Sequence, residues 1–165
     1  ISHTATIAKM PPQSSLIDEI NNIPVFDYAC EHLKELHKLG AITIIITNRD
    51  IQFIEALKTN KKFKKMNPYI SHIITADEIG YTKPSPKVIN FVLNKLKLHN
   101  IKNEEIAFVG DSLADMNTAL HYPCVPVLLL ATSSDITDEF LTQNDDKIYI
   151  ANTHKEIYDA LKQRP

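Results

Sequence analysis

The stretch from Ile106 to Asp115 constrains the fold of this chain more than any other. It reads Ile-Ala-Phe-Val-Gly-Asp-Ser-Leu-Ala-Asp, so four apolar residues run into a glycine and then into two carboxylates four positions apart. A short apolar run closed by glycine is typical of a parallel strand that is covered on both faces. Open α/β sheets bind their ligands just beyond the carboxyl ends of such strands. We therefore expect Asp111 and Asp115 to lie at a functional site.

The composition agrees with a globular domain. The 165 residues are 44% apolar with a formal net charge of -2, which fits a chain that buries a core and gives no support to nucleic-acid or anionic-membrane partners. The longest apolar runs, such as residues 127–131, fall far short of the roughly 20 residues that a bilayer helix needs. Cys30 and Cys124 lack metal-ligand spacing and are expected to be buried free thiols, which favours a cytoplasmic location.

Strands and helices alternate along most of the sequence. Apolar and β-branched runs predict strands at residues 41–46, 70–75, 106–109, 125–130 and 147–150. Apolar residues at helical spacing predict a helix that Asp27 caps and that ends about Leu39, before Gly40. Another helix is predicted to begin at Pro86, with Ser85 as its cap. This alternation predicts an α/β fold with a doubly wound parallel sheet.

We expect a single domain over residues 1–165. Residues 24–165 would form the core, and residues 1–23 an irregular or cap-like segment. Within that segment, residues 4–8 are a strand candidate and residues 15–20 a short helix candidate. The chain begins with Ile1 rather than methionine, which leaves room for residues upstream, including a targeting segment.

The carboxylate pair suits a metal ion. Asp111 and Asp115 lie on one short loop, and Mg²⁺ is a hard cation that binds through one or two protein carboxylates together with water and substrate phosphate. An aspartate after a strand is also a common helix cap, so the pair alone does not decide the function. We take both residues as candidate Mg²⁺ ligands.

Groups that suit a phosphate follow other strands. Thr47 and Asn48 come directly after the strand at residues 41–46, and Lys83 precedes a helix start rich in proline. A hydroxyl, an amide and a flexible ammonium group suit phosphate oxygens, and Arg49 offers a bidentate fork. Each group alone has an ordinary structural explanation, but the carboxyl ends of parallel strands share one edge of a sheet. We therefore take these four residues as candidates for substrate binding at the edge that holds the carboxylates.

Taken in order, these motifs resemble those of the haloacid dehalogenase (HAD) superfamily. The second motif of that superfamily is a hydrophobic strand ending in Thr-Asn, the third is a lysine often followed by proline, and the fourth is Gly-Asp-x-x-x-Asp. Here they read IIITN, GYTKPSP and FVGDSLAD. The resemblance covers the chain from about Pro24 to its end, and the fourth motif is the most specific part.

The resemblance implies roles for the candidate residues. Thr47 and Asn48 would hold the phosphoryl oxygens, Lys83 would neutralise phosphate and nucleophile, and Asp111 and Asp115 would serve Mg²⁺. Lys83 and Asp111 would thus be catalytic. The double acid favours the phosphatase branch, acting on a small-molecule phosphate ester, on a Rossmann-like core. Only about 36 positions separate Thr47 from Lys83, which implies a small cap or none there.

One motif of the family is not in the chain. The first motif, Asp-x-Asp, supplies both the nucleophile that becomes an aspartyl phosphate and the general acid/base. The sequence contains no Asp-x-Asp, and only Asp18 and Asp27 precede Thr47. Neither aspartate follows a buried strand, and Asp27 is better explained as a helix cap.

Two explanations of this departure remain open. In the first, the nucleophile lies on a strand upstream of Ile1. In the second, residues 4–8 are that strand without its acids, and the chain is a phosphate-binding or scaffold module. By resemblance the first-motif strand lies at the centre of the sheet, and its loss would expose two strand edges and much apolar surface. Some strand is therefore expected in that place, and we favour the upstream one.

Overall fold

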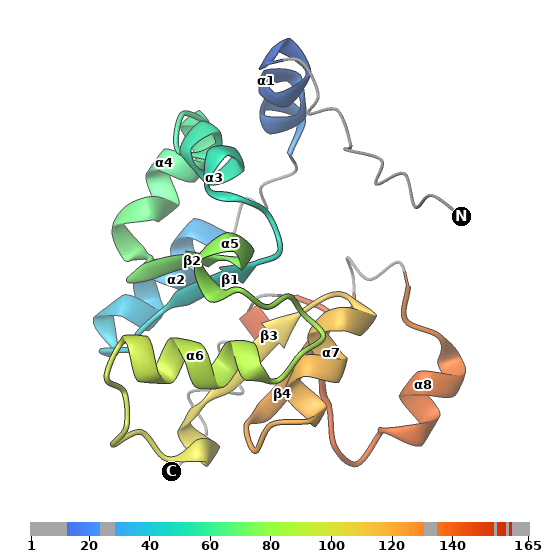
Figure 1. Ribbon diagram of the computed structural model, residues 1–165. Helices are drawn as coiled ribbons and strands as arrows, with labels where there is room; N and C mark the ends of the chain where they lie inside the picture. The colour runs from blue at the N-terminus through green and yellow to red at the C-terminus, as the bar shows by residue number, and fades with distance from the viewer. Residues whose placement is uncertain (1–12, 24–28, 131–134, 154, 158, 160–165) are drawn as a thin grey trace, which may run out of the picture.

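The computed structural model describes residues 13–23, 29–130, 135–153, 155–157 and 159 (Figure 1). Its strands are β1 (Ile44–Thr47), β2 (His72–Thr75), β3 (Ala107–Gly110), β4 (Val125–Leu129) and β5 (Tyr149–Ala151). Its α-helices are α1 (Gln13–Asn22), α2 (Ala29–Lys38), α3 (Ile51–Leu57), α4 (Lys61–Met66), α5 (Ala76–Ile79), α6 (Lys87–Lys95), α7 (Leu113–Leu120) and α8 (Asp138–Gln143). Two short 3₁₀ helices, η1 (Asn67–Tyr69) and η2 (Asn103–Glu105), precede β2 and β3.

The strands form a parallel α/β arrangement, as the alternation predicts. β1 pairs with β2, and β3, β4 and β5 pair in that order, every pairing being parallel. Each expected strand is present, but β1 begins at Ile44 rather than at Ala41. The preceding residues complete the end of α2 instead, because the Ala41 N–H donates to the Leu36 carbonyl after Gly40 turns the chain at φ +79°.

Capping residues in the sequence explain where several helices begin, and one expected helix start is corrected. Asp50, Asn60 and Ser112 cap α3, α4 and α7 through side-chain oxygens. Helix α6 was expected to begin at Pro86 with Ser85 as its cap, but it begins one residue later and Pro86 occupies the cap position. The Asp27 cap and the strand candidate at residues 4–8 lie outside the described residues, whereas the short helix expected at residues 15–20 is present as α1.

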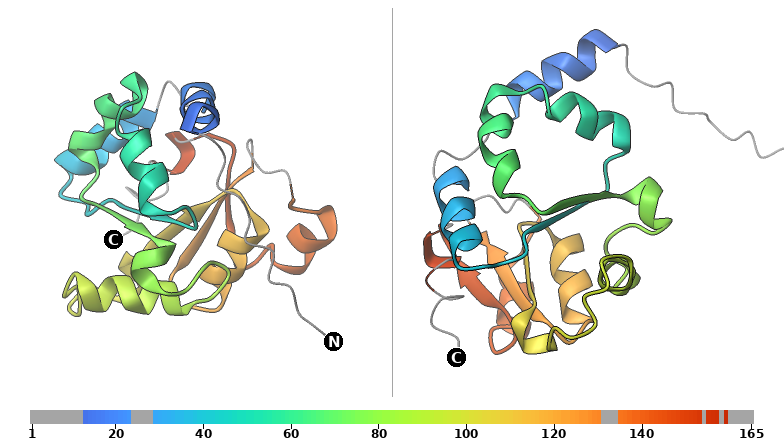
Figure 2. Two further views of the ribbon diagram at one scale, coloured as in Figure 1. Left: turned by 45° about the horizontal axis from the view of Figure 1, so that its top comes forward. Right: turned by 90° about the vertical axis from the view of Figure 1, so that its left-hand side faces the viewer.

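Helices cover both faces of the strands. In the views of Figures 1 and 2, α6 and α7 lie on one side and α2 and α4 on the other. The buried cluster that α6 forms with residues of β2 and α5 connects the two strand groups, because Ile44 and Ile46 of β1 and Phe108 of β3 all pack against it. Helix α1 packs on α3. Within the described ranges, no helix has the length and apolar character that crossing a bilayer requires.

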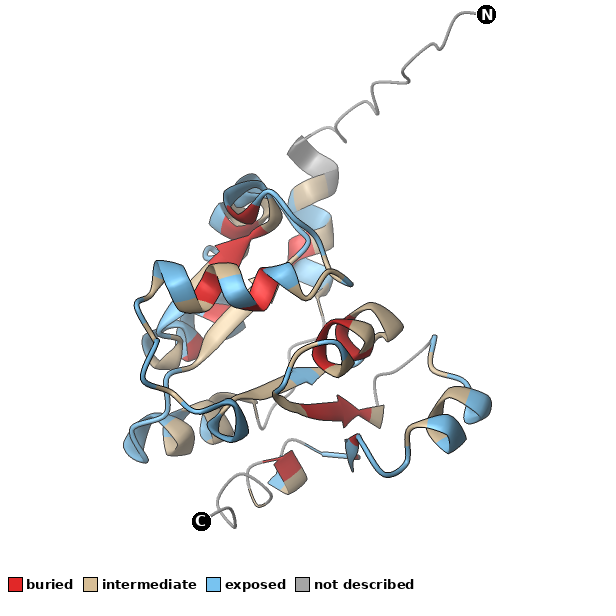
Figure 3. Ribbon diagram, turned by 60° about the horizontal axis from the view of Figure 1, so that its bottom comes forward, coloured by how far each residue is buried: buried red, intermediate tan, exposed pale blue. Residues whose placement is uncertain are grey.

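Burial is uneven among the strands (Figure 3). The central residues of β4, Val127 and Leu128, are 1% and 0% exposed. No residue of β1 or β3 reaches the buried class, and Val109 of β3 is 42% exposed. The two cysteines were expected to be buried, but both are free and only half-buried.

Candidate active site

The end of β1 is joined to the loop before α6 by the side chain of Asn48. Its Oδ1 accepts a hydrogen bond from the Lys83 backbone N–H (2.9 Å), and its Nδ2 donates to the Lys83 carbonyl (3.2 Å). Both polar atoms of the amide are therefore engaged with one residue. In this structure Asn48 positions Lys83, which its sequence context alone does not reveal.

Lys83 in turn connects β1 to the region that follows β3. Its Nζ lies 2.5 Å from Oδ1 of Asp115, and the two side chains are only 16% and 8% exposed. An ion pair this sheltered from water is electrostatically stronger than one on the surface. The carboxyl ends of β1 and β3 therefore meet at one place, as expected from a parallel arrangement.

Asp115 is held firmly because it belongs to the first turn of α7. Its Oδ2 accepts hydrogen bonds from the Ser112 hydroxyl (2.6 Å) and from the Ser112 N–H (3.3 Å), and the Ser112 Oγ accepts from the Asp115 N–H (3.2 Å). This reciprocal pattern is a capping box. Gly110 makes room for it, since a Cβ there would lie 2.2 Å from the Asp115 Cβ. The glycine of the Gly-Asp motif is thus required by close packing.

Asp111 differs from Asp115 in its surroundings. It is exposed at the end of β3, and its carboxylate has no hydrogen bond or ion pair with any described residue. Its backbone N–H donates to Oδ2 of Asp115 (3.4 Å), which keeps the two residues adjacent. Nearby, Asp135 accepts a hydrogen bond from the Leu113 N–H (2.9 Å) at the start of α7. The carboxylate of Asp111 is therefore the one best placed to accept a cation.

The donor set is compatible with Mg²⁺. Among the residues that the structure describes, no group of three or more His, Cys, Asp or Glu side chains gathers at metal-binding distance. Mg²⁺ does not need such a group, because it keeps several waters and takes one or two carboxylates. Asp111 and Asp115 offer two carboxylates in one loop, although Asp115 shares its oxygens with Lys83 and Ser112.

Thr47 and Arg49 lie at the same strand end but make different contacts. The Thr47 hydroxyl oxygen accepts a hydrogen bond from the Arg49 N–H (3.1 Å). The Arg49 guanidinium forms an ion pair with Glu19 of α1 (2.5 Å) and lies over the Phe53 ring at 4.6 Å from its centroid. No described contact joins Arg49 to Lys83. The sequence shows no motif that marks Glu19, since the pair joins residues thirty positions apart.

Asp77 of α5, two residues after the end of β2, stabilises the same edge, and the sequence analysis did not identify it. Its Oδ2 accepts a hydrogen bond from the Ile51 N–H at the start of α3 (3.2 Å). Desolvation raises the pKa of Asp77, but hydrogen bonds from its own N–H, from the Ile51 N–H and from Thr75 together lower it below its ordinary value. The carboxylate form is thus favoured where the ends of β1 and β2 meet.

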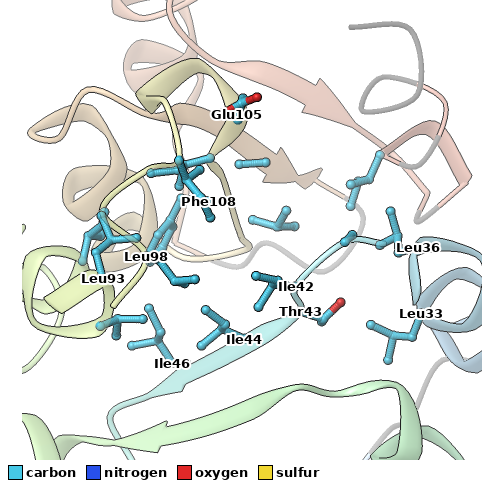
Figure 4. Close-up of a pocket in the computed structure, with 18 of the residues that line it drawn as sticks. Leu33, Leu36, Ile42, Thr43, Ile44, Ile46, Leu93, Leu98, Glu105 and Phe108 are labelled. Carbon is cyan, nitrogen blue, oxygen red and sulfur yellow. The ribbon is translucent and has the colours of Figure 1, made fainter. Parts of the chain in front are cut away.

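A cavity of about 830 Å³ lies between β1 and β3 (Figure 4). Lys83 is one of its lining residues, and Ile42, Thr43 and Glu105 lie near the amino ends of the two strands. Its other lining side chains are mostly aliphatic and come from α2, β1, α6 and β3. The candidate site and this cavity are therefore continuous.

The family model of the haloacid dehalogenase-like hydrolases matches residues 5–121 of the sequence. The chain belongs to this hydrolase family. Phosphoglycolate phosphatases of Pseudomonas fluorescens and Vibrio parahaemolyticus are 34% and 29% identical to it over 95 and 94 residues. These matches cover 58% and 57% of this chain but 33% and 39% of the relatives. The chain thus matches well under half the length of these relatives.

Solved structures of phosphatases share the fold. A predicted phosphoglycolate phosphatase from Haemophilus somnus superposes with a TM-score of 0.70 at 20% identity, over 87% of this chain and 60% of that one. The D,D-heptose 1,7-bisphosphate phosphatase of B. bronchiseptica, determined with magnesium and phosphate, gives a TM-score of 0.63 at 16% identity over 84% of each chain. At these identities the likeness concerns the fold alone.

Proposed function

We propose that this protein is a Mg²⁺-dependent phosphatase that acts on a small-molecule phosphate monoester through an aspartyl-phosphate intermediate. The observation that carries the proposal is the buried Lys83–Asp115 ion pair at the joined ends of β1 and β3, next to the free carboxylate of Asp111. Membership of a hydrolase family and the phosphatase names of the relatives support it. The nucleophilic aspartate is proposed to lie on a strand upstream of residue 1.

Each candidate residue has a role that its contacts suit. Lys83, held through its backbone by Asn48, presents a single positive charge to a phosphate and to the attacking carboxylate. Asp111 and Asp115 would hold Mg²⁺. When bound there, the ion would offset negative charge on the phosphate oxygens. The hydroxyl of Thr47, at the last position of β1, is placed to donate to a phosphate oxygen.

The proposed reaction has two steps. A carboxylate oxygen of the nucleophilic aspartate bonds to phosphorus while the ester P–O bond breaks, and the alcohol leaves with the bonding pair and a proton from the second aspartate of Asp-x-Asp. Water, deprotonated by that same aspartate, then attacks and releases inorganic phosphate and the free nucleophile. Lys83 offsets the charge of the nucleophilic aspartate, which attacks in the first step and leaves in the second.

The relatives suggest the first substrate to try. Their names make phosphoglycolate, a small ester with its own carboxylate, the leading candidate. Arg49 is a cation at the edge of the site, and its side chain is 57% exposed although it pairs with Glu19. We propose that Arg49 contacts the part of the substrate that is not transferred.

Hydrolysis of p-nitrophenyl phosphate tests the proposal. The protein is expressed with an Asp-x-Asp strand before Ile1 and assayed with Mg²⁺. We expect turnover that a chelator abolishes and that Asp111→Asn lowers by about 100-fold or more. The matched control is Asp145→Asn, which changes an exposed aspartate outside the candidate site and is expected to leave turnover unchanged. Turnover that is insensitive to Asp111→Asn would contradict the assignment of the metal site.

The alternative is a non-catalytic phosphate-binding or scaffold domain. The lack of an Asp-x-Asp motif within residues 1–165 favours it, because Lys83 and Thr47 can contact a phosphate without a nucleophile. This alternative predicts no turnover in a well-folded protein that carries the strand. It also predicts binding of inorganic phosphate, measured by calorimetry, that Lys83→Met removes.

A further inference from the structure

Arg49 is held by two side chains at the edge of the candidate site. Its guanidinium carbon lies 4.6 Å from the centre of the Phe53 ring, and its Nη2 lies 2.5 Å from Oε1 of Glu19. Its backbone N–H donates to the hydroxyl oxygen of Thr47, a proposed phosphate ligand. The ring therefore covers one face of the guanidinium, and the Glu19 carboxylate occupies part of its N–H edge.

Glu19 is held in place independently of Arg49, because the helix that carries it is anchored. The neighbouring Ile20 is 2% exposed, and its carbonyl accepts a hydrogen bond from the Asn60 side chain (3.0 Å). The same side chain caps α4 through its Oδ1. Helix α1 also packs against α3, which carries Phe53. The carboxylate of Glu19 is therefore a fixed neighbour of the Arg49 guanidinium.

The contact between Arg49 and Glu19 is nevertheless one that another anion can replace. The two side chains are 57% and 39% exposed, and exposed ion pairs contribute little free energy because water and salt screen them. A carboxylate is the same chemical group as the side chain of Glu19 and suits the same N–H donors of the guanidinium. A carboxylate that enters the site therefore meets a cation that is already paired, but only weakly.

We propose that Glu19 determines substrate specificity by competing with the substrate for Arg49. An ester whose non-transferred part carries a carboxylate binds by replacing Glu19 at the guanidinium. An ester with a neutral group at that position leaves the ion pair intact. Glu19 thus lowers the preference of the site for esters that carry a second anionic group. The inference rests on the proposed function, because it takes the phosphate of the ester to bind beside Thr47.

Two esters of similar size test the competition. Phosphoglycolate carries a carboxylate, and ethyl phosphate carries a methyl group in its place. Their dissociation constants are measured by calorimetry with Mg²⁺ and the 165-residue chain, which contains Thr47, Arg49 and Glu19 but not the proposed nucleophile, so that the esters are bound without being hydrolysed. The quantity compared is the constant for ethyl phosphate divided by that for phosphoglycolate, because effects on the shared phosphate cancel in this ratio.

Glu19→Gln is expected to raise this ratio about two- to fivefold, because the amide keeps the shape of the side chain but removes the competing charge. The matched control is Glu55→Gln, which removes the same charge from an exposed pair with Lys58 on α3. It is expected to change the ratio by less than about 1.5-fold. Arg49→Met is expected to lower the ratio about fivefold or more, because the carboxylate then meets Glu19 without its cation. An unchanged or lowered ratio in Glu19→Gln, or an equal rise in Glu55→Gln, would overturn the proposal.

Ionic strength separates competition between charges from a change in the packing of α1. In about 1 M NaCl the Debye length falls to about 3 Å, so exposed charges scarcely interact. The ratio for Glu19→Gln is then expected to lie within about 1.5-fold of the ratio for the unsubstituted chain. A difference that persists in 1 M NaCl would show that Glu19 acts through the fold of α1, and would overturn the competition.

The proposed function has a separate readout, which is hydrolysis of both esters by the protein that carries the Asp-x-Asp strand. Glu19→Gln is expected to lower KM for phosphoglycolate about two- to fivefold and to change kcat by less than about twofold, because Glu19 lies beside the part that is not transferred. Absence of hydrolysis together with a raised binding ratio contradicts the proposed function alone. Hydrolysis with an unchanged ratio contradicts the role of Glu19 alone, and failure of phosphoglycolate to bind contradicts both.

Discussion

β4 and β3 are neighbours in one sheet, yet they differ sharply in burial. β4 has a strand on each side, and its residues from Pro126 to Leu129 are buried. Among the described residues, β3 pairs with β4 alone, and Val109 is 42% exposed although it pairs with the buried Val127. β1 resembles β3, since none of its residues reaches the buried class. Pairing on both edges thus accompanies the burial of β4, whereas β2, which pairs only with β1 among the described residues, still buries Ile74 and Thr75.

The comparison also shows a mismatch between the sequences of two strands and their burial. Parallel sheets are normally buried on both faces and read as continuous apolar runs, and β1 and β3 have such sequences. Their composition thus suits the middle of a sheet, whereas their exposure is that of an edge. The candidate site lies at the carboxyl ends of these same two strands, because the Lys83–Asp115 ion pair joins the end of β1 to the end of β3.

The largest expected effect comes from the paired strand. Leu128 is 0% exposed, so Leu128→Ala is expected to lower the free energy of unfolding by about 4 kcal/mol through lost burial and a cavity. Val109→Ala removes atoms that water already reaches and is expected to lower it by less than about 1 kcal/mol. Urea denaturation of both variants measures the difference. Similar losses would mean that β3 is as well packed as β4.

The next prediction concerns the contact between the two strand groups. Lys83→Met leaves the Asp115 carboxylate buried without its cation, which is expected to lower the free energy of unfolding by about 3 kcal/mol. The control is Lys58→Met, which breaks the exposed pair of Lys58 with Glu55 (42% and 60% exposed). That variant is expected to change stability by less than about 0.5 kcal/mol. Equal changes in urea denaturation would show that the Lys83 pair does not join the groups.

Much of this arrangement is visible in the sequence. Apolar runs mark every strand because strands of a covered parallel sheet need apolar residues on both faces. Gly110, Asp111 and Asp115 stand together in one motif, and the structure shows a reason for the glycine in its close approach to Asp115. Features set by local chain geometry were therefore predicted well.

Features that depend on contacts between distant segments were not predicted from the sequence. The sequence does not show that both polar atoms of the Asn48 amide form hydrogen bonds with the Lys83 backbone. Nor does it show that Arg49 forms an ion pair with Glu19. Such contacts depend on which segments meet in space, and no local pattern records that.

Gly110→Ala tests how tightly the end of β3 is packed. A methyl group there would meet Asp115 at its Cβ and Cγ, 2.2 and 2.5 Å away, so the first turn of α7 must move. We expect the free energy of unfolding to fall by about 1–3 kcal/mol. The effect should not add to that of Lys83→Met, because both changes act on Asp115. Strict additivity in a double-mutant cycle would contradict this shared mechanism.

The smallest expected effect concerns the amino end of β4. Cys124 lies directly before this strand with its Sγ 3.7 Å from the Ala119 carbonyl, and burial raises the pKa of its thiol to about 11. A thiol with this pKa is only about 0.1% thiolate at pH 8, so iodoacetamide should label it slowly in a Cys30→Ser background, about tenfold faster per pH unit. Its folded pKa exceeds the ordinary value of 9.0, so the unfolded chain loses the proton first and this group's contribution to stability falls between about pH 9 and 11. Rapid labelling at pH 8 would show that water reaches the start of β4 as freely as it reaches Val109 on β3.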